Sequence, residues 1–205
     1  LRPSACRELE PGLASVAAGV LAPHEGAVDP RSMVAALVGA FEAAGGAIET
    51  GEVAEAVIDG ERLAGVRTRD GREHQALTTV LAAGSWSASE WLPAPARPPI
   101  RPVKGQILTL RGPAGEPVCD RIVVTERVYM VPRADGRLVV GATVEEQGFD
   151  TRITAGGVHE LLRFQRAVVL ADARVVAADD RARDPVVLAR DDVPDGLAGS
   201  RVAHG

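Results

Sequence analysis

The amino-acid sequence predicts an α+β protein, in which a helix with short strands forms a first part and an antiparallel sheet forms a second part. Three observations predict this fold class. A capped helix begins at residue 30, short strands separated by Asp-Gly turns follow it, and a β-hairpin lies beyond a proline-rich segment at 93–102. We place the boundary between the two parts in that segment, because such stretches are typical of linkers.

The composition indicates a packed protein and excludes several functional classes. Hydrophobic residues make up 46% and charged residues 25%, as in globular domains. A net charge of −5, with Arg interleaved among Asp and Glu, argues against nucleic-acid binding, which favours a basic face. Two cysteines and four scattered histidines predict neither a disulfide framework nor a metal site. No apolar run approaches the ~20 residues of a membrane helix, so the cytoplasm is the expected location.

The first predicted element is a helix that begins at residue 30. Residues 1–28 are rich in Gly and Pro and are expected to form loops and short turns. Asp29 is a favourable N-cap, and Pro30 occupies the first helical position, where its missing N–H costs nothing. Gly45–Gly46 ends the helix. The apolar residues that recur on one face of this helix are Met33, Val34, Leu37, Val38 and Phe41.

Short strands follow the helix. Residues 53–58, 63–68 and 72–77 are separated by Asp-Gly turns, and this pattern indicates an antiparallel meander. The run at 79–83 is apolar without alternation and ends at Gly84. Such a run is typical of a strand buried on both faces of a parallel sheet.

The second part begins with strands predicted at 105–110 and 121–125. Residues 128–133 and 137–143 then form the strongest hairpin signal, because the three-residue loop between them ends in Gly136. Thr154 is expected to cap a helix over about 158–170. The remaining residues, 171–205, are charged and weakly patterned.

Several stretches, taken in order, resemble the D-amino-acid-oxidase family of FAD-dependent amine oxidases, and within it the bacterial glycine oxidases of thiamine biosynthesis. They are VLAAGSWS at 80–87, RPVKGQ at 101–106, and YMVPR, GRLVVGAT and FDT within 129–151. The resemblance covers residues 5–165 and implies an incomplete Rossmann-like flavoprotein. It places a partial FAD-binding domain at 1–95, an antiparallel-sheet substrate domain at 96–170, and a segment that returns to the FAD domain at 171–205.

The resemblance also implies site residues. Tyr129 would bind the substrate carboxylate through its hydroxyl, and Val144 and Arg133 would line the substrate pocket. The residues implied in cofactor binding are Val53, Ala83, Gly84 and Trp86. The residue types alone leave plainer alternatives open: a tyrosine packed at a sheet edge, an ordinary turn at Gly84, a tryptophan in the core and an exposed charge at Arg133.

The activity implied by the resemblance is FAD-dependent oxidation of glycine or a small D-amino acid by oxygen, which yields an oxo acid, ammonia and hydrogen peroxide and supplies thiazole formation. No nucleic-acid or membrane partner is expected, and a homo-oligomer is left open. The family's G-x-G-x-x-G turn and its C-terminal Arg segment do not occur in these residues, so we expect an internal piece. The alternatives are a catalytically inactive remnant or interaction module, and a related sarcosine oxidase or D-amino-acid dehydrogenase.

Overall fold

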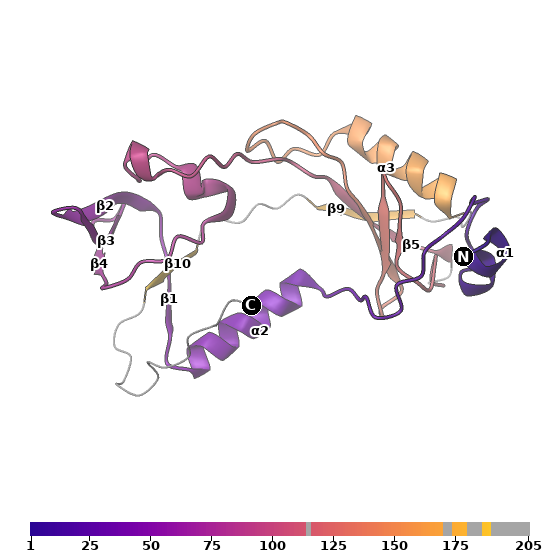
Figure 1. The fold of residues 1–205 in the computed structure, drawn as a ribbon, viewed down its shortest axis with the longest axis horizontal. Helices are drawn as coiled ribbons and strands as arrows, with labels where there is room; N and C mark the ends of the chain where they lie inside the picture. The colour runs from indigo at the N-terminus through magenta and orange to yellow at the C-terminus, as the bar shows by residue number, and fades with distance from the viewer. Residues whose placement is uncertain (114–115, 170–173, 180–185, 190–205) are drawn as a thin grey trace. The chain divides into compact units, whose positions relative to one another are not determined.

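The structure is a computed structural model that describes residues 1–113, 116–169, 174–179 and 186–189 (Figure 1). The chain divides into two compact units. Of the described residues, unit 1 comprises 1–28 with 102–113, 116–169 and 174–179, and unit 2 comprises 29–101 with 186–189. The mixture of helices and antiparallel sheets confirms the predicted α+β class.

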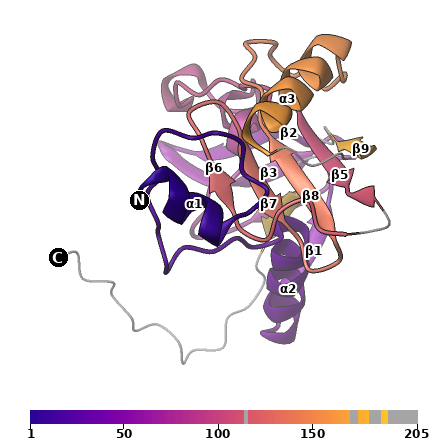
Figure 2. The same ribbon diagram turned by 90° about the vertical axis from the view of Figure 1, so that its right-hand side faces the viewer.

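Unit 1 is built on a five-stranded antiparallel sheet with the strand order β6-β7-β8-β5-β9 (Figure 2). The strands are β5 (Ile107–Arg111), β6 (Val123–Val124), β7 (Tyr129–Pro132), β8 (Arg137–Gly141) and β9 (Arg174–Asp179). The predicted hairpin is confirmed, because β7 pairs with β8 from Tyr129↔Gly141 to Pro132↔Leu138. Gly136, which ends the loop, has a φ of 79°, a value that glycine adopts without strain.

Helix α3 (Ala155–Val168; orange in Figure 1) covers one face of this sheet. Thr154 caps it as predicted, because its hydroxyl oxygen accepts the backbone N–H of Gly157 at 3.1 Å. Alternate residues of the central strands point toward α3 and are fully buried, whereas their neighbours on the opposite face are only half-buried. The largest side chains of this core are Leu108, Leu110, Met130, Leu138, Val140 and Leu161.

The expectation that residues 1–28 form only loops and turns is wrong, because they include helix α1 (Pro3–Leu9). Pro3 stands in the first turn, where no backbone N–H is needed, and good helix formers follow it. The buried carboxylate of Glu10 then accepts the backbone N–H groups of Asp120 at 2.9 Å and Arg121 at 3.0 Å. These contacts over more than 100 residues hold the N-terminal segment in unit 1 and have no local sequence signal.

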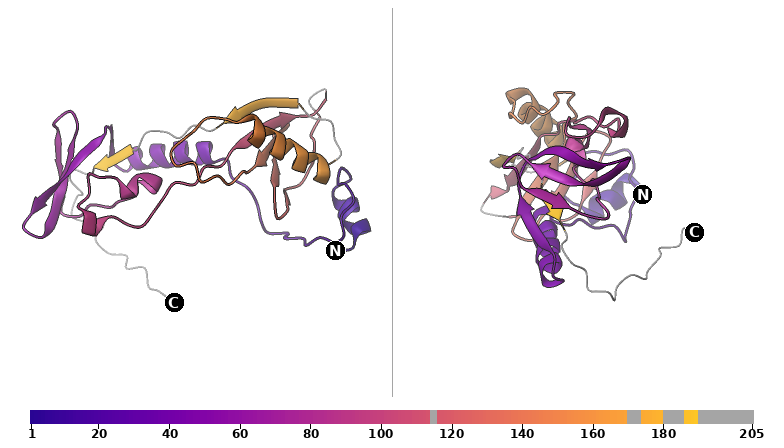
Figure 3. Two further views of the ribbon diagram at one scale, coloured as in Figure 1. Left: turned by 90° about the horizontal axis from the view of Figure 1, so that it is seen from above. Right: turned by 90° about the vertical axis from the view of Figure 1, so that its left-hand side faces the viewer.

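Unit 2 contains helix α2 (Pro30–Ala43) and two antiparallel sheets. Strand β1 (Ala47–Thr50) pairs with β10 (Val186–Ala189), while β2 (Val53–Asp59), β3 (Arg62–Thr68) and β4 (Glu73–Gln75) form the second sheet (violet in Figure 3). This second sheet confirms the predicted meander. Gly60 and Gly71 occupy its turns with φ values of 61° and 89°.

Helix α2 begins as predicted but does not bury its apolar face. The Asp29 carboxylate accepts the backbone N–H groups of Arg31 at 2.9 Å and Ser32 at 3.4 Å, which confirms the cap. No residue of α2 is buried, and Val34 and Leu37 are 56% and 62% exposed. The one-sided apolar pattern predicts the helix correctly. It does not predict whether another described element packs against the apolar face of that helix.

The strand predicted at 79–83 is also wrong. These residues have no strand geometry, and Val80 is 82% exposed. A strand buried on both faces requires hydrogen-bonded neighbours and covering layers, and none of the described strands pairs with this run. The run leads instead into the 3-10 helices η1 (Gly84–Ala88) and η2 (Ala94–Ala96).

Within the described ranges, the helices are too short or too polar to cross a membrane. The segment 171–205 contributes β9 and β10, and its other residues lie outside the described ranges.

Replacing Asp29 with Ala is expected to lower the free energy of unfolding by about 1 kcal/mol, because two N–H groups of α2 lose their acceptor. Urea unfolding followed by circular dichroism measures this change. Asp29→Ser is the matched control, because its hydroxyl restores a capping oxygen. An Asp29→Ala variant as stable as the wild type would contradict the prediction.

Candidate functional site on the open sheet face

Tyr129 lies on the face of the five-stranded sheet opposite α3. Its neighbour Met130 is fully buried in the core, so strand alternation directs Tyr129 to the other face, where its residue is 36% exposed. The ring lies across the backbone of Gly141 on β8, the residue directly paired with Tyr129. A Cβ built on Gly141 would stand 2.3 Å from both Cζ and Oη of the ring.

Apolar side chains surround this ring on the same face. Val124 pairs with Tyr129, and Val131 with Val139 forms the next pair on that face of β7 and β8. Ile107 of β5 pairs with Gly141 from the other side and is half-buried. Around Tyr129 this face therefore offers an apolar patch with a phenol hydroxyl at one end, while Thr109, Arg111 and Arg137 make the rest of the face polar. We call this surface, made by Ile107, Val124, Tyr129, Val131 and Val139, the open face of unit 1.

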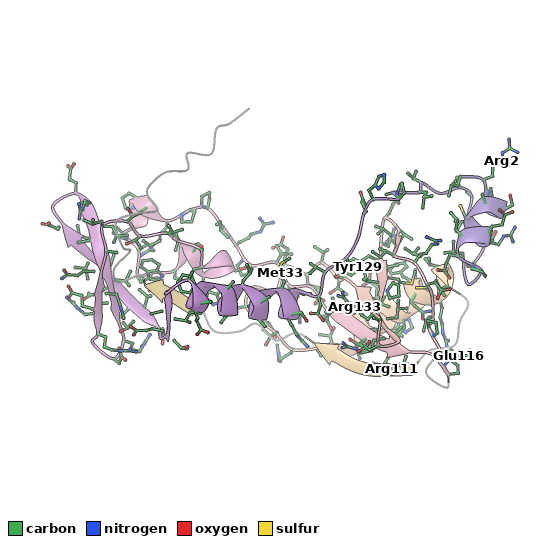
Figure 4. All side chains as sticks on the ribbon, turned by 90° about the horizontal axis from the view of Figure 1, so that it is seen from below. Arg2, Met33, Arg111, Glu116, Tyr129 and Arg133 are labelled. Atoms are coloured by element: carbon green, nitrogen blue, oxygen red, sulfur yellow. The ribbon has the colours of Figure 1, made fainter. Side chains whose placement is uncertain are left out.

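The other two residues implied in the substrate pocket lie at different ends of the hairpin. Val144 follows β8 by three residues, on the same end of the sheet as Tyr129, and is 82% exposed. Arg133 directly follows β7 at its opposite end and is half-buried (Figure 4). Arg133 lies four positions after Tyr129, which corresponds to about 13 Å along a strand. Val144 and Tyr129 thus lie at the same end of the hairpin, and Arg133 lies at the other end.

A buried polar network lies beside the candidate pocket wall Val144. The carboxamide of Gln106, only 1% exposed, donates to Oε1 of Glu145 at 2.6 Å and to the hydroxyl of Thr154 at 2.9 Å. Its carbonyl oxygen accepts the backbone N–H of Thr154 at 2.9 Å. Thr143 completes the network, because its hydroxyl accepts the N–H of Gln106 at 2.9 Å and donates to Glu145 at 2.5 Å.

Charge in this network is concentrated on Glu145. The hydrogen bonds from Thr143 and Gln106, with the nearby Lys104 ammonium, hold the pKa of the Glu145 carboxyl below its usual value of 4.5. Lys104 Nζ lies 3.8 Å from Glu145 Oε2 and also donates to the backbone carbonyl of Arg152. Glu145 is therefore ionised at neutral pH and holds the segment that carries Val144 against β5.

The residues implied in cofactor binding all lie in unit 2. Val53 begins β2 and pairs with Thr68. Ala83 precedes η1, and its carbonyl accepts the backbone N–H of Trp86 at 3.0 Å, so that Ala83, Gly84 and Trp86 share one turn. Gly84 has a φ of 51° and open space where a side chain would begin. A backbone exposed in this way can be approached closely by a ligand.

Sequence reasoning missed the two features that fix the site in unit 1, namely Gly141 and the Gln106 network. Gly141 could have been found, because a loop at 134–136 pairs 133 with 137 and therefore 129 with 141. The Gln106 network joins residues 48 positions apart and has no local signal. Cys119 is excluded as a nucleophile, because burial first and then the carboxylates of Glu10 and Asp120 raise the pKa of its thiol to about 12.

Comparisons with known proteins agree on one family. The family model described as "DAO: FAD dependent oxidoreductase" matches residues 1–197. The "Bifunctional protein ThiO/ThiG" of Synechocystis sp. is 39% identical over 160 residues, which cover 76% of this chain and 24% of that protein. The "Glycine oxidase" of Pseudomonas aeruginosa is 36% identical over 132 residues, which cover 63% of this chain and 35% of the relative.

Solved structures show the same likeness. The crystal structure of glycine oxidase from Geobacillus kaustophilus matches with a TM-score of 0.73 and 30% identity, over 92% of this chain and 50% of that chain. Glycine oxidase from Bacillus cereus matches in fold, with a TM-score of 0.76 and 24% identity over 92% of this chain and 51% of that chain. The chain thus spans between a quarter and half of the length of these relatives.

Replacing Gln106 with Leu is expected to lower the free energy of unfolding by about 1–3 kcal/mol, because Thr154 and Glu145 lose buried partners. Urea unfolding of the variant measures the loss. Gln147→Leu is the matched control in the same unit, since Gln147 is exposed. Equal stability of the two variants would show that the network does not hold the unit together.

The contribution of Glu145 to stability is expected to depend on pH. Because folding lowers the pKa of its carboxyl, the contribution is complete above the unfolded pKa and is lost as pH falls through the folded value. The destabilisation caused by Glu145→Gln should therefore be largest near neutral pH and shrink below about pH 4.5. Unfolding free energies over this range test it, with the exposed Glu160→Gln as control. A destabilisation that does not vary with pH would contradict the prediction.

Proposed function

The chain belongs to the family of FAD-dependent oxidoreductases, and we propose that it supplies the substrate-facing sheet and part of the cofactor-binding region of an enzyme that oxidises glycine or a small D-amino acid. The observation that carries this proposal is the Tyr129 hydroxyl at one end of an apolar sheet face. Relatives named glycine oxidase, matched in both sequence and structure, support the choice of a small amino acid.

The division of the chain into two units agrees with a division of roles. Tyr129, Val144 and Arg133, which we assign to the substrate, lie in unit 1, and the residues assigned to the cofactor lie in unit 2. We therefore propose unit 1 as the substrate domain and unit 2 as a partial FAD-binding domain. Residues 1–28, expected in the FAD domain, pack with unit 1 and are assigned to it here.

The turn that contains Gly84 and Trp86 suits contact with part of FAD. The turn at Gly84, with its positive φ and free approach to the backbone, suits contact with a flat ring or a ribityl chain. Trp86 in the same turn is half-buried and can shield one side of such a group. The G-x-G-x-x-G turn that binds the pyrophosphate in Rossmann-like folds does not occur among the 205 residues, so we assign no residue of this chain to the phosphates.

The residues of unit 1 would position the substrate. The Tyr129 hydroxyl donates a hydrogen bond to the substrate carboxylate, which is costly to bury without a donor. The apolar side chains around it exclude water, while Val144 limits the size of the group on the α-carbon. FAD, when bound, supplies the acceptor for the hydride that leaves this carbon. The protein contributes position and electrostatics rather than a general base.

The proposed overall reaction converts glycine, oxygen and water to glyoxylate, ammonia and hydrogen peroxide. A role in supplying the thiazole of thiamine and a location in the cytoplasm complete the proposal. The test is to express the full natural reading frame that contains this chain and to record flavin absorbance and glycine-dependent peroxide. Bound flavin with peroxide from glycine supports the proposal, and a colourless, inactive protein refutes it in favour of an interaction module.

Substrate profiling in the same assay separates the related activities. Sarcosine turned over better than glycine would favour a sarcosine oxidase. A D-amino acid oxidised faster with an artificial electron acceptor than with oxygen would favour a dehydrogenase.

Replacing Tyr129 with Phe is expected to raise KM for glycine about tenfold to a hundredfold, because a hydrogen bond to a charged group contributes about 1.5–3 kcal/mol. Steady-state peroxide production by the full-length enzyme measures the change. Flavin content should remain unchanged, because Tyr129 lies outside the unit assigned to the cofactor. An unchanged KM would exclude Tyr129 as the carboxylate ligand.

A further inference from the structure

Gly141 is the residue on which the Tyr129 ring rests. The two residues are direct partners in the β7–β8 ladder. A Cβ on Gly141 would lie 2.3 Å from Cζ and Oη and 2.8 Å from Cε2 of Tyr129. These three atoms form the hydroxyl end of the ring. An aromatic side chain that covers the backbone of a cross-strand glycine is a known stabilising pair in sheets.

The neighbours of Gly141 distinguish it from Gly65 and Gly112, two glycines that pack against backbone. At Gly65 and Gly112 an added Cβ would meet backbone atoms, at 2.1 Å from the carbonyl oxygen of His74 and 2.3 Å from that of Glu116. At Gly141 it would meet only the far end of one side chain, which can rotate. A side chain at Gly141 therefore displaces the phenol and leaves the ladder in place.

The backbone of Gly141 cannot retreat to relieve such a contact. It ends β8 between two partners, Tyr129 on β7 and Ile107 on β5. Two residues later, Thr143 is held by Gln106 through its hydroxyl and its backbone N–H. The ring must then move until the separation rises from 2.3 Å to an ordinary contact of at least 3.4 Å.

We propose that Gly141 is a positioning residue that sets where the Tyr129 hydroxyl lies on the open face, and thereby sets the affinity for a substrate carboxylate. The shift that any side chain at Gly141 imposes on the hydroxyl is about 1 Å, roughly twice the width of the range of O–H···O distances that make a hydrogen bond. The statement about the carboxylate rests on the function proposed above. The statement about the ring does not.

The first experiment monitors the surroundings of the Tyr129 ring by NMR in the absence of substrate. Carbon-13-labelled tyrosine is incorporated into the full-length protein, and the Tyr129 signal is assigned by its loss in Tyr129→Phe. Gly141→Ala is expected to shift this signal, while Gly156→Ala, a glycine on α3 with open space at its Cβ, is expected to leave it in place. A Tyr129 signal unmoved by Gly141→Ala overturns the proposal, whether or not the protein oxidises glycine.

The second experiment is a double-mutant cycle on KM for glycine. Gly141→Ala should raise KM about tenfold or more with a smaller change in kcat, as expected for loss of the same hydrogen bond. In the Tyr129→Phe background, where the hydroxyl is absent, Gly141→Ala should change KM less than threefold. Equal fold-changes in both backgrounds would show a general structural role and overturn the proposal.

A double variant tests the proposal if Gly141→Ala alone does not fold. If the ring is what the glycine accommodates, Tyr129→Ala combined with Gly141→Ala should fold where Gly141→Ala alone does not. A double variant that also fails to fold overturns the proposal, because the obstacle to a side chain would then lie elsewhere in the sheet.

Discussion

The buried carboxamide of Gln106 is the interaction on which the rest of unit 1 depends. It ties the cap of α3 to the start of β5 and to the segment after β8, two segments that the β5–β8 ladder already places side by side. All of its polar atoms have partners, so burial carries no penalty. Gly157 makes this close approach possible, since a Cβ there would lie 2.4 Å from the Gln106 nitrogen. One side chain thus links both the cap of α3 and the segment that carries Val144 to β5.

The elements that the sequence predicts well are those with signals inside one turn. Asp29 with Pro30, Gly136 in the hairpin loop and Thr154 before α3 each act on atoms a few residues away, and each behaves in the structure as expected. The elements that the sequence predicts wrongly depend on distant parts of the chain. The run at 79–83 and the N-terminal helix depend on which distant segments are available for packing, and this information is not local.

The candidate site divides in the same way. Motif matching identified Tyr129, whose face follows from alternation alone. The residues that position Tyr129 could be identified only from the strand pairing and the close contacts in the structure. A glycine in a strand pattern does not reveal which side chain covers it. Arg133 illustrates the limit of adjacency in sequence: it belongs to the same motif as Tyr129, yet it follows the other end of the strand.

Among the described residues no element covers the apolar face of α2, and this affects the physical behaviour of the chain. Met33, Val34, Leu37 and Val38 are 46%, 56%, 62% and 38% exposed and form one continuous helical stripe. Contiguous apolar stripes of this kind drive association in water. The net charge of −5 is modest for 205 residues and opposes such association only weakly. We therefore expect this stripe to promote association of the isolated chain, and a charged residue in place of Leu37 to reduce that association.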